Sequence, residues 1–497
     1  MEPIKDYLKE IEKAFSAGNA TEHTHRPALK TLIETLFSSV TATNEPRRVQ
    51  CGAPDYVISR GPVPLGYIEA KDIGKSLTEV EKSEQLKRYL ASLGNIVLTD
   101  YLEFRWYVAG QHRLTARLAT VGADGKLRKE KQEEQVKDLL TGFIQQTTPT
   151  INSPKELAGK MAALARLIHD TIKKAFNAED PTDKPFHEQL EGFRKVLLHD
   201  LTPDQFSDMY SQTICYGLFA ARCNANPTER FTRQHAVYDL PKTNPFLRKM
   251  FNHIAGPDLD ERIVWIVDDL SEILNHTDIE AILKDFGRRT RQEDPVVHFY
   301  ETFLAAYDPK MREARGVYYT PEPVVSFTVR SVDYILKTVF KLPQGLADAS
   351  KIKVKDPKDP KSKGQIEVHK VQILDPATGT GTYLHGVVDQ IYSYFQDNKG
   401  MWSSYVQQHL LPRLYGFELL MAPYAVAHLK LGLQLKELGY DFTSSERIRI
   451  YLTNTLEEAH ALTGLPLFTQ WIADEANAAS EIKKDAPVMV VVGNPPF

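Results

Sequence analysis

Hydrophobic positions along the chain follow helical spacing in some stretches and strand spacing in others, and this pattern divides the chain into three segments. In the first segment, up to about residue 110, helical spacing over 26–40 aligns five apolar side chains: Leu29, Leu32, Ile33, Leu36 and Phe37. Residues 79–93 have the pattern of a charged amphipathic helix. Short apolar runs predict four strands, at 55–59, 65–71, 95–99 and 104–108. The order of these elements predicts a mixed α/β domain.

The middle of the chain is dominated by helical periodicity. Residues 157–176, 186–198 and 262–286 each predict a helix, and strand signals are scarce between about 150 and 315. Between the first segment and these helices, the glycine-containing tract 122–125 and the charged stretch 126–137 have the composition of a linker. We therefore expect a helical connector in the middle.

The last segment alternates strand and helix. Four short, apolar runs predict buried parallel strands, at 371–374, 413–417, 448–452 and 488–492. Helical patterns lie between them, at 383–395, 423–438 and 467–479. This alternation predicts a doubly wound sheet. Residues 343–370 interrupt it with lysines among prolines and aspartates, and a solvated insertion is a better interpretation of them than a DNA-facing loop. These lysines are Lys351, Lys353, Lys355, Lys358, Lys361 and Lys363. The expected domains are 1–120, 121–314 and 315–497.

Length and composition support this multidomain α/β organisation. The chain has 497 residues, too many for one ordinary core, and its 42% hydrophobic and 25% charged residues are typical of globular proteins. No apolar run is long enough to cross a bilayer, and the charged start of the chain predicts no signal peptide. Three scattered cysteines predict no disulfide frame or zinc site, so a cytoplasmic location is expected. With a formal net charge of −4, any nucleic-acid binding must come from local patches.

Polar residues follow the predicted strands of the last segment in an order that suggests a nucleotide-like ligand. Asp375, Ala377, Gly379 and Gly381 come after the first strand, where glycines permit a tight turn and let a ligand approach the backbone at a helix start. Glu418 closes the second strand, where a carboxylate in such sheets binds ribose hydroxyls.

Two further groups complete this order. Asn454 and Thr455 follow the third strand, where a polar side chain can bind the edge of an adenine ring.

The sequence Asn494-Pro495-Pro496-Phe497 after the fourth strand carries the strongest chemical signal. An exocyclic amino group on a purine is a poor nucleophile, and acceptors for both of its N–H groups make it more reactive. The side-chain carbonyl of Asn494 and the backbone carbonyl of Pro495 can be these acceptors, because prolines stiffen the turn and donate nothing. Phe497 can stack on an extruded base. A simple turn at the end of a strand is the alternative.

These motifs resemble those of a gamma-class DNA adenine methyltransferase over residues 315–497. The resemblance implies a Rossmann-like domain that uses S-adenosylmethionine. The family's opening motif resembles the stretch here that contains Tyr319, Thr320 and Pro321, and the resemblance implies that these residues contact the methionine carboxylate. It also implies that the residues named above contact the rest of the cofactor: Asp375, Ala377, Gly379, Gly381, Glu418, Asn454 and Thr455. Asn454 stands where many members have Asp. Relatives of the catalytic motif also methylate glutamine in proteins, so the motif alone does not fix DNA as the substrate.

The family continues beyond the point where this sequence stops, with further strands and a target-recognition domain. We therefore expect a C-terminally truncated protein with an incomplete doubly wound sheet.

The first segment contains a second candidate site. Glu69 and Lys71 lie two apart, so they point to the same face of a strand, and a hairpin would bring Asp55 alongside. Asp55 and Glu69 could then share Mg²⁺, which activates water for phosphodiester cleavage, and Lys71 could orient the nucleophile. A surface ion pair is the alternative for Glu69 and Lys71. With Gln85 in the helix that follows, this pattern resembles the PD-(D/E)XK nuclease family.

Four more residues near this site have weaker expectations. Glu22 is a possible further acid close to the metal, Glu34 a less favoured one, and His23 and His25 are expected to be solvated.

A nuclease domain, a helical connector and an adenine methyltransferase on one chain resemble a restriction–modification enzyme of the type IIG or single-polypeptide type I kind, with double-stranded DNA as partner. Gly74-Lys75-Ser76 suggests a phosphate-binding loop, but Glu69 stands where that motif needs glycine, so no ATP motor is expected. The alternatives are a stand-alone modification methyltransferase with an inactive nuclease domain, an inert truncated DNA-binding remnant and, last, a protein-glutamine methyltransferase.

Overall fold

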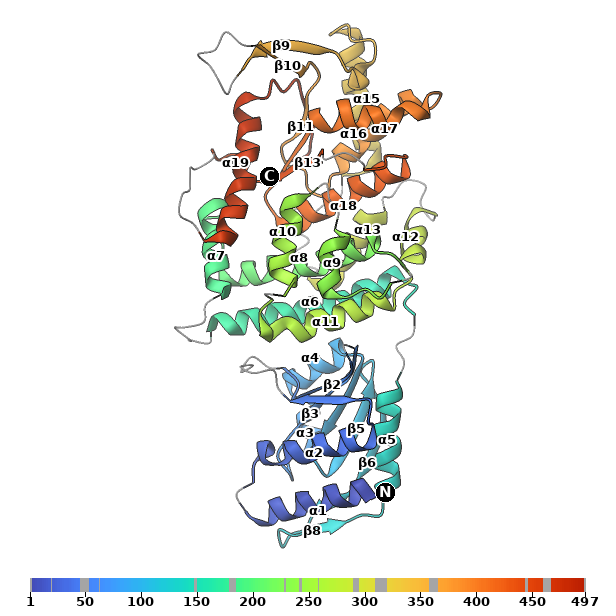
Figure 1. The fold of residues 1–497 in the computed structure, drawn as a ribbon, viewed down its shortest axis with the longest axis vertical. Helices are drawn as coiled ribbons and strands as arrows, with labels where there is room; N and C mark the ends of the chain where they lie inside the picture. The colour runs from blue at the N-terminus through green and yellow to red at the C-terminus, as the bar shows by residue number, and fades with distance from the viewer. Residues whose placement is uncertain are drawn as a thin grey trace. The chain divides into compact units, whose positions relative to one another are not determined.

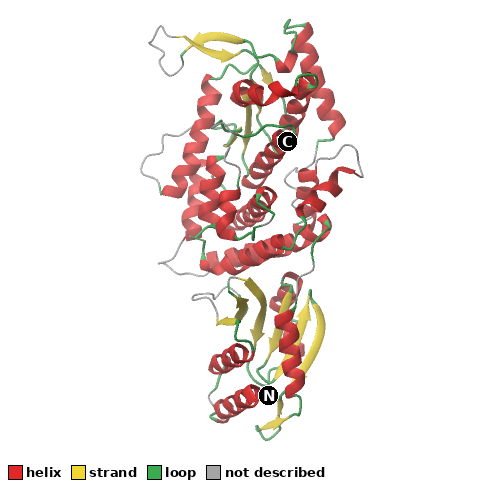
Figure 2. Ribbon diagram, turned by 45° about the vertical axis from the view of Figure 1, so that its right-hand side comes forward, coloured by secondary structure: helices red, strands yellow, loops and turns green. Residues whose placement is uncertain are grey.

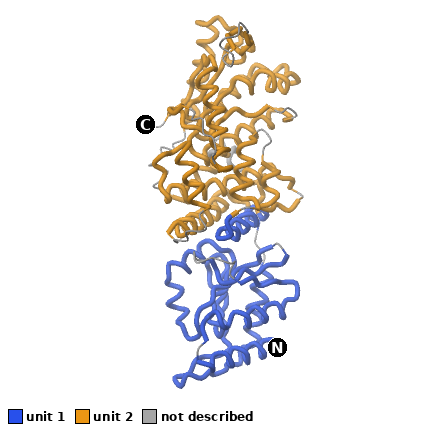
Figure 3. Tube along the Cα trace, turned by 60° about the vertical axis from the view of Figure 1, so that its left-hand side comes forward, with its two compact units in different colours: residues 1–151, 260–276 blue, residues 152–259, 277–497 orange. Residues whose placement is uncertain are grey.

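The chain forms two compact units (Figure 3). The first contains Met1–Ile151 and Asp260–His276, and the second contains Asn152–Leu259 and Thr277–Phe497. The computed structural model describes residues 2–495, apart from residues 19, 45–52, 62, 147–149, 178–184, 228, 241–243, 258, 289–294, 309–319, 357–364, 443–445 and 459–465.

A six-stranded sheet forms the centre of the first unit (Figure 2). Neighbouring strands pair in chain order, and β3 pairs with β4 in parallel while the other pairs are antiparallel. The strands are β1 Thr41–Asn44, β2 Tyr56–Arg60, β3 Val63–Ala70, β4 Asn95–Thr99, β5 Glu103–Val108 and β6 Gln111–Arg117. A small ladder of β7 Ala119–Val121 and β8 Leu127–Lys129 follows. The four strands expected from the sequence are therefore present, with β1 and β6 added at the edges.

Helices pack on this sheet because each has one apolar face. They are α1 Glu2–Ser16, α2 Glu22–Leu36, α3 Leu77–Glu81, α4 Glu84–Ser92 and α5 Glu133–Gln145. The single helix expected over 79–93 is instead two helices, because Ser83 caps α4 by accepting a hydrogen bond from the Leu86 N–H at 3.3 Å.

The tract expected to be a linker is part of the core of the first unit. Residues 126–137 contain β8 and the start of α5, and α5 buries five apolar side chains: Val136, Leu139, Leu140, Phe143 and Ile144. The amide of Asn95 donates to the Phe143 carbonyl at 2.8 Å, which ties α5 to β4. Charged residues on the exposed side of α5 gave the stretch the composition of a linker, while its buried face makes it structural.

Helices make up most of the second unit before its sheet. They are α6 Pro154–Asn177, α7 Pro185–Val196, α8 Pro203–Asn224, α9 Arg233–Asp239, α10 Pro245–Ala255, α12 Ile279–Arg288 and α13 Pro295–Tyr307. The long helix expected over 262–286 is two helices, because Asp278 accepts from the Ala281 N–H at 2.9 Å and starts α12. The part before the break, α11 Glu261–Asn275, belongs to the first unit, where Trp265 packs edge-on against Tyr67 of β3.

The second unit contains a four-stranded, all-parallel sheet in the order β13-β12-β11-β14. Its strands are β11 Ile373–Asp375, β12 Leu414–Glu418, β13 Arg449–Leu452 and β14 Val490–Val491, and α15 Glu322–Thr338, α16 Thr382–Tyr392, α17 Trp402–Tyr405, α18 Met421–Glu437 and α19 Leu467–Asp485 accompany them (Figure 1). The predicted alternation of strand and helix is confirmed.

Helices cover both faces of this sheet. Ala479 of α19 clusters with Tyr415 and Phe417 on one face, while Leu384 of α16 lies at Gly416 on the other. The preceding helices are not a separate connector, because they pack on the same unit: the Phe193 ring of α7 lies 5.6 Å from that of Phe468 in α19.

The lysine-rich stretch is an ordered hairpin where it is described. β9 Lys351–Lys355 and β10 Gln365–His369 form an antiparallel ladder, and the three lysines of β9 are exposed. Lys358, Lys361 and Lys363 lie outside the described residues. Among the described residues, no helix combines the length and the apolar composition that crossing a membrane requires.

We predict that Leu139→Ala destabilises the first unit by about 2–5 kcal/mol, because it removes a fully buried side chain and leaves a cavity. Urea unfolding followed by tryptophan fluorescence would measure this loss. Asp138→Ala on the exposed side of the same helix is the control and should change the free energy of unfolding by less than about 0.5 kcal/mol. Equal stability of the two variants would contradict the assignment of α5 to the core.

Candidate functional sites

The first unit gathers three of the expected nuclease residues at the end of β3. Glu69 is 3% exposed, and its Oε1 accepts from Lys71 Nζ at 2.5 Å and from Gln85 Nε2 at 3.3 Å. Asp55 lies beside them at the start of β2, where its Oδ2 accepts from the Ala70 N–H at 2.7 Å. The hairpin therefore places Asp55 next to Glu69, as expected.

Arg26 completes this group, and the sequence interpretation missed it. Its Nη2 donates to Glu22 Oε1 at 2.6 Å and also to Asp55 Oδ1. Glu22 and Arg26 are four residues apart on α2, a spacing that puts both on one side of the helix and that could have suggested the pair. Gln85 also donates to Tyr89 Oη at 3.2 Å, which holds the amide toward Glu69.

The other acids and histidines of α2 differ in position. Glu34 is not at the site, because its Oε1 accepts from the Ala42 N–H at 3.0 Å and so fastens α2 to β1. His25 is buried against the Tyr101 ring, with ring centroids 5.3 Å apart, so the expectation that it is solvated is wrong. His23 is exposed, as expected.

Burial controls the charge of the two predicted metal ligands. It raises the pKa of Asp55 to about 6, against the hydrogen bond from Ala70 that lowers it. It raises the pKa of Glu69 to about 7, and the nearby Asp55 carboxyl raises it further while Lys71 lowers it. Protonation of these carboxyls near neutral pH would weaken any cation site that they form.

The donor chemistry of this group fits a divalent cation, although no three His, Cys, Asp or Glu side chains in the described part of the chain are arranged to hold one. Asp55 and Glu69 provide carboxylate oxygens, and Mg²⁺ is commonly held by one or two carboxylates with water. Glu69 Oε2 is buried and has no hydrogen-bond partner. A buried carboxylate oxygen in that state is an available ligand atom.

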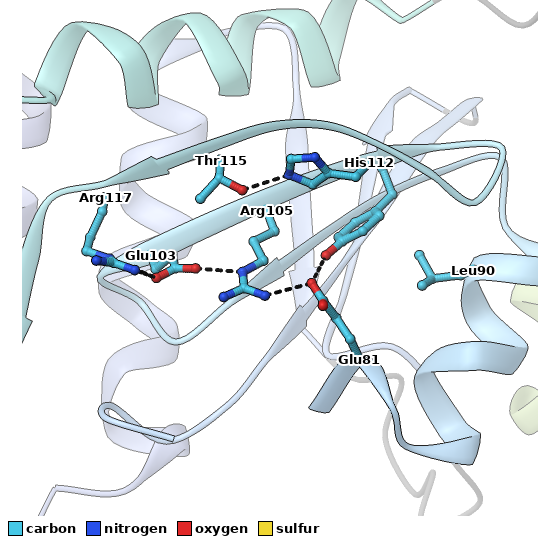
Figure 4. Close-up of a pocket in the computed structure, with 8 residues that line it drawn as sticks. Glu81, Leu90, Glu103, Arg105, His112, Thr115 and Arg117 are labelled. Atoms are coloured by element: carbon cyan, nitrogen blue, oxygen red, sulfur yellow. Dashed lines mark hydrogen bonds and ion pairs between the residues drawn. The ribbon is translucent and has the colours of Figure 1, made fainter. Parts of the chain in front are cut away.

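A cavity of about 520 Å³ opens at another part of the same sheet (Figure 4). Arg105 in its wall donates to Glu81 Oε1 at 2.8 Å and to Glu103 Oε1 at 2.6 Å, and Glu103 also binds Arg117. These groups compensate one another's charge, so the cavity has little net charge to attract a ligand.

The second candidate site lies where the parallel strands of the second unit end. Asp375 ends β11 and pairs in register with Gly416, and Glu418 ends the neighbouring β12. Glu418 Oε2 accepts from the Gly379 N–H at 2.7 Å. The structure therefore brings Glu418, at the end of β12, next to the glycine loop that follows β11, as the sequence predicts.

The loop between β11 and α16 needs its glycines. Gly379 and Gly381 have φ angles of 56° and 82°, in the left-handed region that other residues rarely adopt. Asp375 Oδ1 accepts from the Ala377 N–H at 3.1 Å, which closes the first turn of the loop. The loop then passes directly into α16 at Thr382, so backbone N–H groups at a helix start face this edge of the sheet.

Gly493 and Gly416, to which the sequence interpretation gave no role, leave room for the side chains of Asp375 and Thr378. A Cβ on Gly493 would lie 2.5 Å from Asp375 Oδ1, and one on Gly416 would lie 2.6 Å from Thr378 Oγ1. The backbone comes so close to a neighbouring side chain at both positions that only glycine fits without a shift.

The loop after β13 is held by hydrogen bonds on both sides. Thr455 Oγ1 donates to the Pro376 carbonyl at 2.6 Å, and Asn454 Nδ2 donates to Glu457 Oε1 at 2.9 Å. Lys483 of α19 donates to the Asn454 carbonyl at 2.6 Å. Asn454 and Thr455 thus lie beside the loop that follows β11, and no pattern in the sequence indicated the support from Lys483.

The two ends of the last segment also meet here. Asn494 Nδ2 donates to Thr320 Oγ1 at 3.2 Å across 174 positions of sequence. Asn494 is exposed and follows Gly493, which lies against Asp375, while Pro321 starts α15. Pro495 is described and exposed; three other expected site residues lie outside the described residues: Tyr319, Pro496 and Phe497.

Comparison with known families addresses this segment directly. Residues 291–497 match the family model described as N-6 DNA Methylase. The match includes all four strands of the parallel sheet and every expected cofactor residue of the second unit. No curated relative matches the sequence.

Several solved structures show weak similarity to this chain. A DrdV–DNA complex has a TM-score of 0.44 and 21% identity over 100% of this chain and 44% of its own. A nuclease-deletion mutant of the type ISP enzyme LlaGI with a DNA substrate mimic has a TM-score of 0.47 and 18% identity over 73% of this chain and 26% of its own. The type IIG restriction endonuclease BpuSI has a TM-score of 0.28 and 15% identity over 96% of this chain and 45% of its own.

This chain thus spans less than half the length of those proteins. Likeness at this level carries no argument about function.

Burial also raises the pKa of Asp375 and of Glu418 in the second unit. The pKa of Asp375 rises from 3.8 to about 7, and that of Glu418 from 4.5 to about 7, because each is almost fully removed from water. Three backbone N–H groups donate to Glu418, from Gly379, Leu419 and Leu420, and they oppose this rise.

We predict that the free energy of unfolding falls as pH rises from about 4 to about 7, because the unfolded chain loses the protons of these carboxyls before the folded chain does. Glu418→Gln should remove part of this slope, so its stability relative to the wild type should rise over that interval by on the order of 3 kcal/mol at most. Urea unfolding at a series of pH values measures this. Glu367→Gln at an exposed position should keep the wild-type slope, and a Glu418→Gln curve parallel to the wild type would contradict the raised pKa.

Proposed function

We propose that the segment 315–497 is a gamma-class, S-adenosylmethionine-dependent DNA methyltransferase domain that transfers a methyl group to the exocyclic amino group of adenine. The observation that carries this proposal is the hydrogen bond between Asn494 and Thr320. It places the amide expected to activate adenine beside the segment expected to bind the cofactor's carboxylate, at the same sheet edge as Asp375. The match of residues 291–497 to the N-6 DNA Methylase family supports it.

The cofactor would lie along the ends of β11, β12 and β13. Glu418 would accept hydrogen bonds from ribose hydroxyls, and the glycine loop at 379–381 would let the ligand approach the start of α16. Asn454 would bind the adenine edge, with its backbone fixed by Lys483. Thr320 and its neighbours Tyr319 and Pro321 would contact the methionine carboxylate. S-adenosylmethionine, when bound, supplies the sulfonium methyl group.

Asn494 and Pro495 would act on the substrate amine and not on the methyl donor. The amide oxygen of Asn494 and the carbonyl of Pro495 would accept hydrogen bonds from the two N–H groups of adenine, and this raises electron density on the nitrogen. Both residues are exposed, so an extruded base could reach them. Pro496 and Phe497 would continue the turn and provide the stacking surface.

We further propose that the first unit is a PD-(D/E)XK-like, Mg²⁺-dependent nuclease, which would make the protein a restriction–modification enzyme of the type IIG kind. Asp55 and Glu69 would hold the metal, Lys71 would orient the attacking water, and Gln85 would keep Glu69 in place. The buried oxygen Glu69 Oε2, which has no hydrogen-bond partner, is the observation that favours a metal here. A methyltransferase with an inactive nuclease domain is the alternative, and an inert DNA-binding remnant is a second one.

Asn494→Ala should lower methyl transfer to DNA at least about a hundredfold, because it removes an acceptor for the substrate amine. Cofactor affinity should fall by no more than about tenfold, because the variant also loses the one hydrogen bond to Thr320. Transfer of tritiated methyl groups measures the rate, and calorimetry with S-adenosylmethionine measures binding. Glu418→Ala should abolish cofactor binding, and methyl transfer with it, while Asn398→Ala at an exposed position should change neither. Full methylation by Asn494→Ala would refute the proposal, and a wild type without cofactor binding would favour the remnant.

Asp55→Ala should abolish Mg²⁺-dependent cleavage of DNA by a protein that contains this chain, because the metal would lose a ligand. Gel analysis of a plasmid substrate, with and without EDTA, measures cleavage. Glu79→Gln, an exposed acid of the same unit, is the control and should cut like the wild type. If the wild type itself does not cut under conditions in which it methylates DNA, the inactive-nuclease alternative holds.

A further inference from the structure

Arg26 lies among the carboxylates that the proposed nuclease would use for its metal. One nitrogen of its guanidinium donates to both Glu22 and Asp55, and its side chain is 8% exposed. Lys71 pairs in the same way with Glu69 Oε1 at 2.5 Å. Arg26 thus pairs with one predicted metal ligand, Asp55, and Lys71 pairs with the other, Glu69. With Glu22, three carboxylates share two cations.

Arg26 and Lys71 compensate the buried negative charge of the carboxylates when no metal is bound. A buried carboxylate with no opposite charge is costly, and Asp55 and Glu22 compensate theirs through Arg26. A metal ion that binds Asp55 needs the same oxygen atoms, because Asp55 Oδ2 already accepts from the Ala70 N–H and Oδ1 accepts from Arg26. Glu69 Oε2, by contrast, is buried and has no hydrogen-bond partner.

We propose that Arg26 is a built-in counter-ion that competes with the divalent metal for Asp55. The proposal rests on the nuclease part of the proposed function and adds a control to it. A divalent cation at Asp55 is repelled by the adjacent guanidinium charge, so it binds more tightly once Arg26 has moved away. Arg26 thus keeps the empty cluster folded and raises the metal concentration at which the cluster fills. It is a positioning residue, since it acts through Asp55 and Glu22.

Titration of the full chain with Mn²⁺, followed by electron paramagnetic resonance, tests this competition without relying on DNA cleavage. Arg26→Met removes the competing charge and keeps much of the side-chain volume. It should tighten Mn²⁺ binding about tenfold or more, a change typical of a close buried charge pair. Lys75→Met removes an exposed charge of the same unit and should leave Mn²⁺ binding as in the wild type. Equal or weaker binding by Arg26→Met would overturn the proposal.

Two more variants separate the possible failures. Asp55→Asn should remove the tight Mn²⁺ site from the wild type and from Arg26→Met. If it changes binding in neither, the metal site is absent and the nuclease proposal fails; if it acts in both while Arg26→Met binds like the wild type, only the competition fails.

Should Arg26→Met not fold, Arg26→Gln takes its place, because it removes the positive charge and keeps N–H donors for the carboxylates. Arg26→Gln should bind Mn²⁺ more tightly than the wild type and gain more melting temperature from saturating Mn²⁺. A folded Arg26→Gln with wild-type affinity would overturn the proposal.

Discussion

The parallel pairing of β11 with β12 is the constraint on which the segment 291–497, the part that matches a family model, depends. Parallel strands end at the same edge of a sheet, so the register Asp375 to Gly416 places Glu418 directly beside the loop that follows β11. That loop can turn there only because Gly379 and Gly381 adopt positive φ angles. Thr320 and Asn494 then reach the same edge from the two ends of the segment. One register therefore organises residues that lie far apart in the sequence.

Much of this segment could be predicted from the sequence because its local signals agree with its tertiary structure. Each buried strand is a short apolar run, each crossover helix has an apolar face, and the functional residues follow the strands directly. The meeting of Glu418 with Gly379 follows from topology alone. The support that Lys483 gives to Asn454 does not, because a lysine on an amphipathic helix has the same pattern whether it faces water or a loop.

Predictions for the rest of the chain failed where tertiary packing decides which core a helix or a side chain joins. Periodicity shows that a helix has an apolar face but not which core receives it, so α11 could not be assigned to the first unit from its own residues. In the same way, α5 has the charge of a linker on one side and core residues on the other. His25 is buried through its contact with Tyr101, which lies 76 positions away in sequence, so no local pattern could reveal it.

The two sites compensate buried negative charge in different ways, and this difference suits two kinds of ligand. Glu418 accepts hydrogen bonds from three backbone N–H groups, which cannot rotate away, so the carboxylate is held in one position. Asp55 and Glu69 are compensated by the side chains of Arg26 and Lys71, which can rotate away. Mobile cations can be exchanged for another cation, whereas backbone dipoles cannot. A fixed cradle at one carboxylate and an exchangeable counter-charge at the others are thus the physical basis for expecting a nucleoside ligand in one unit and a metal ion in the other.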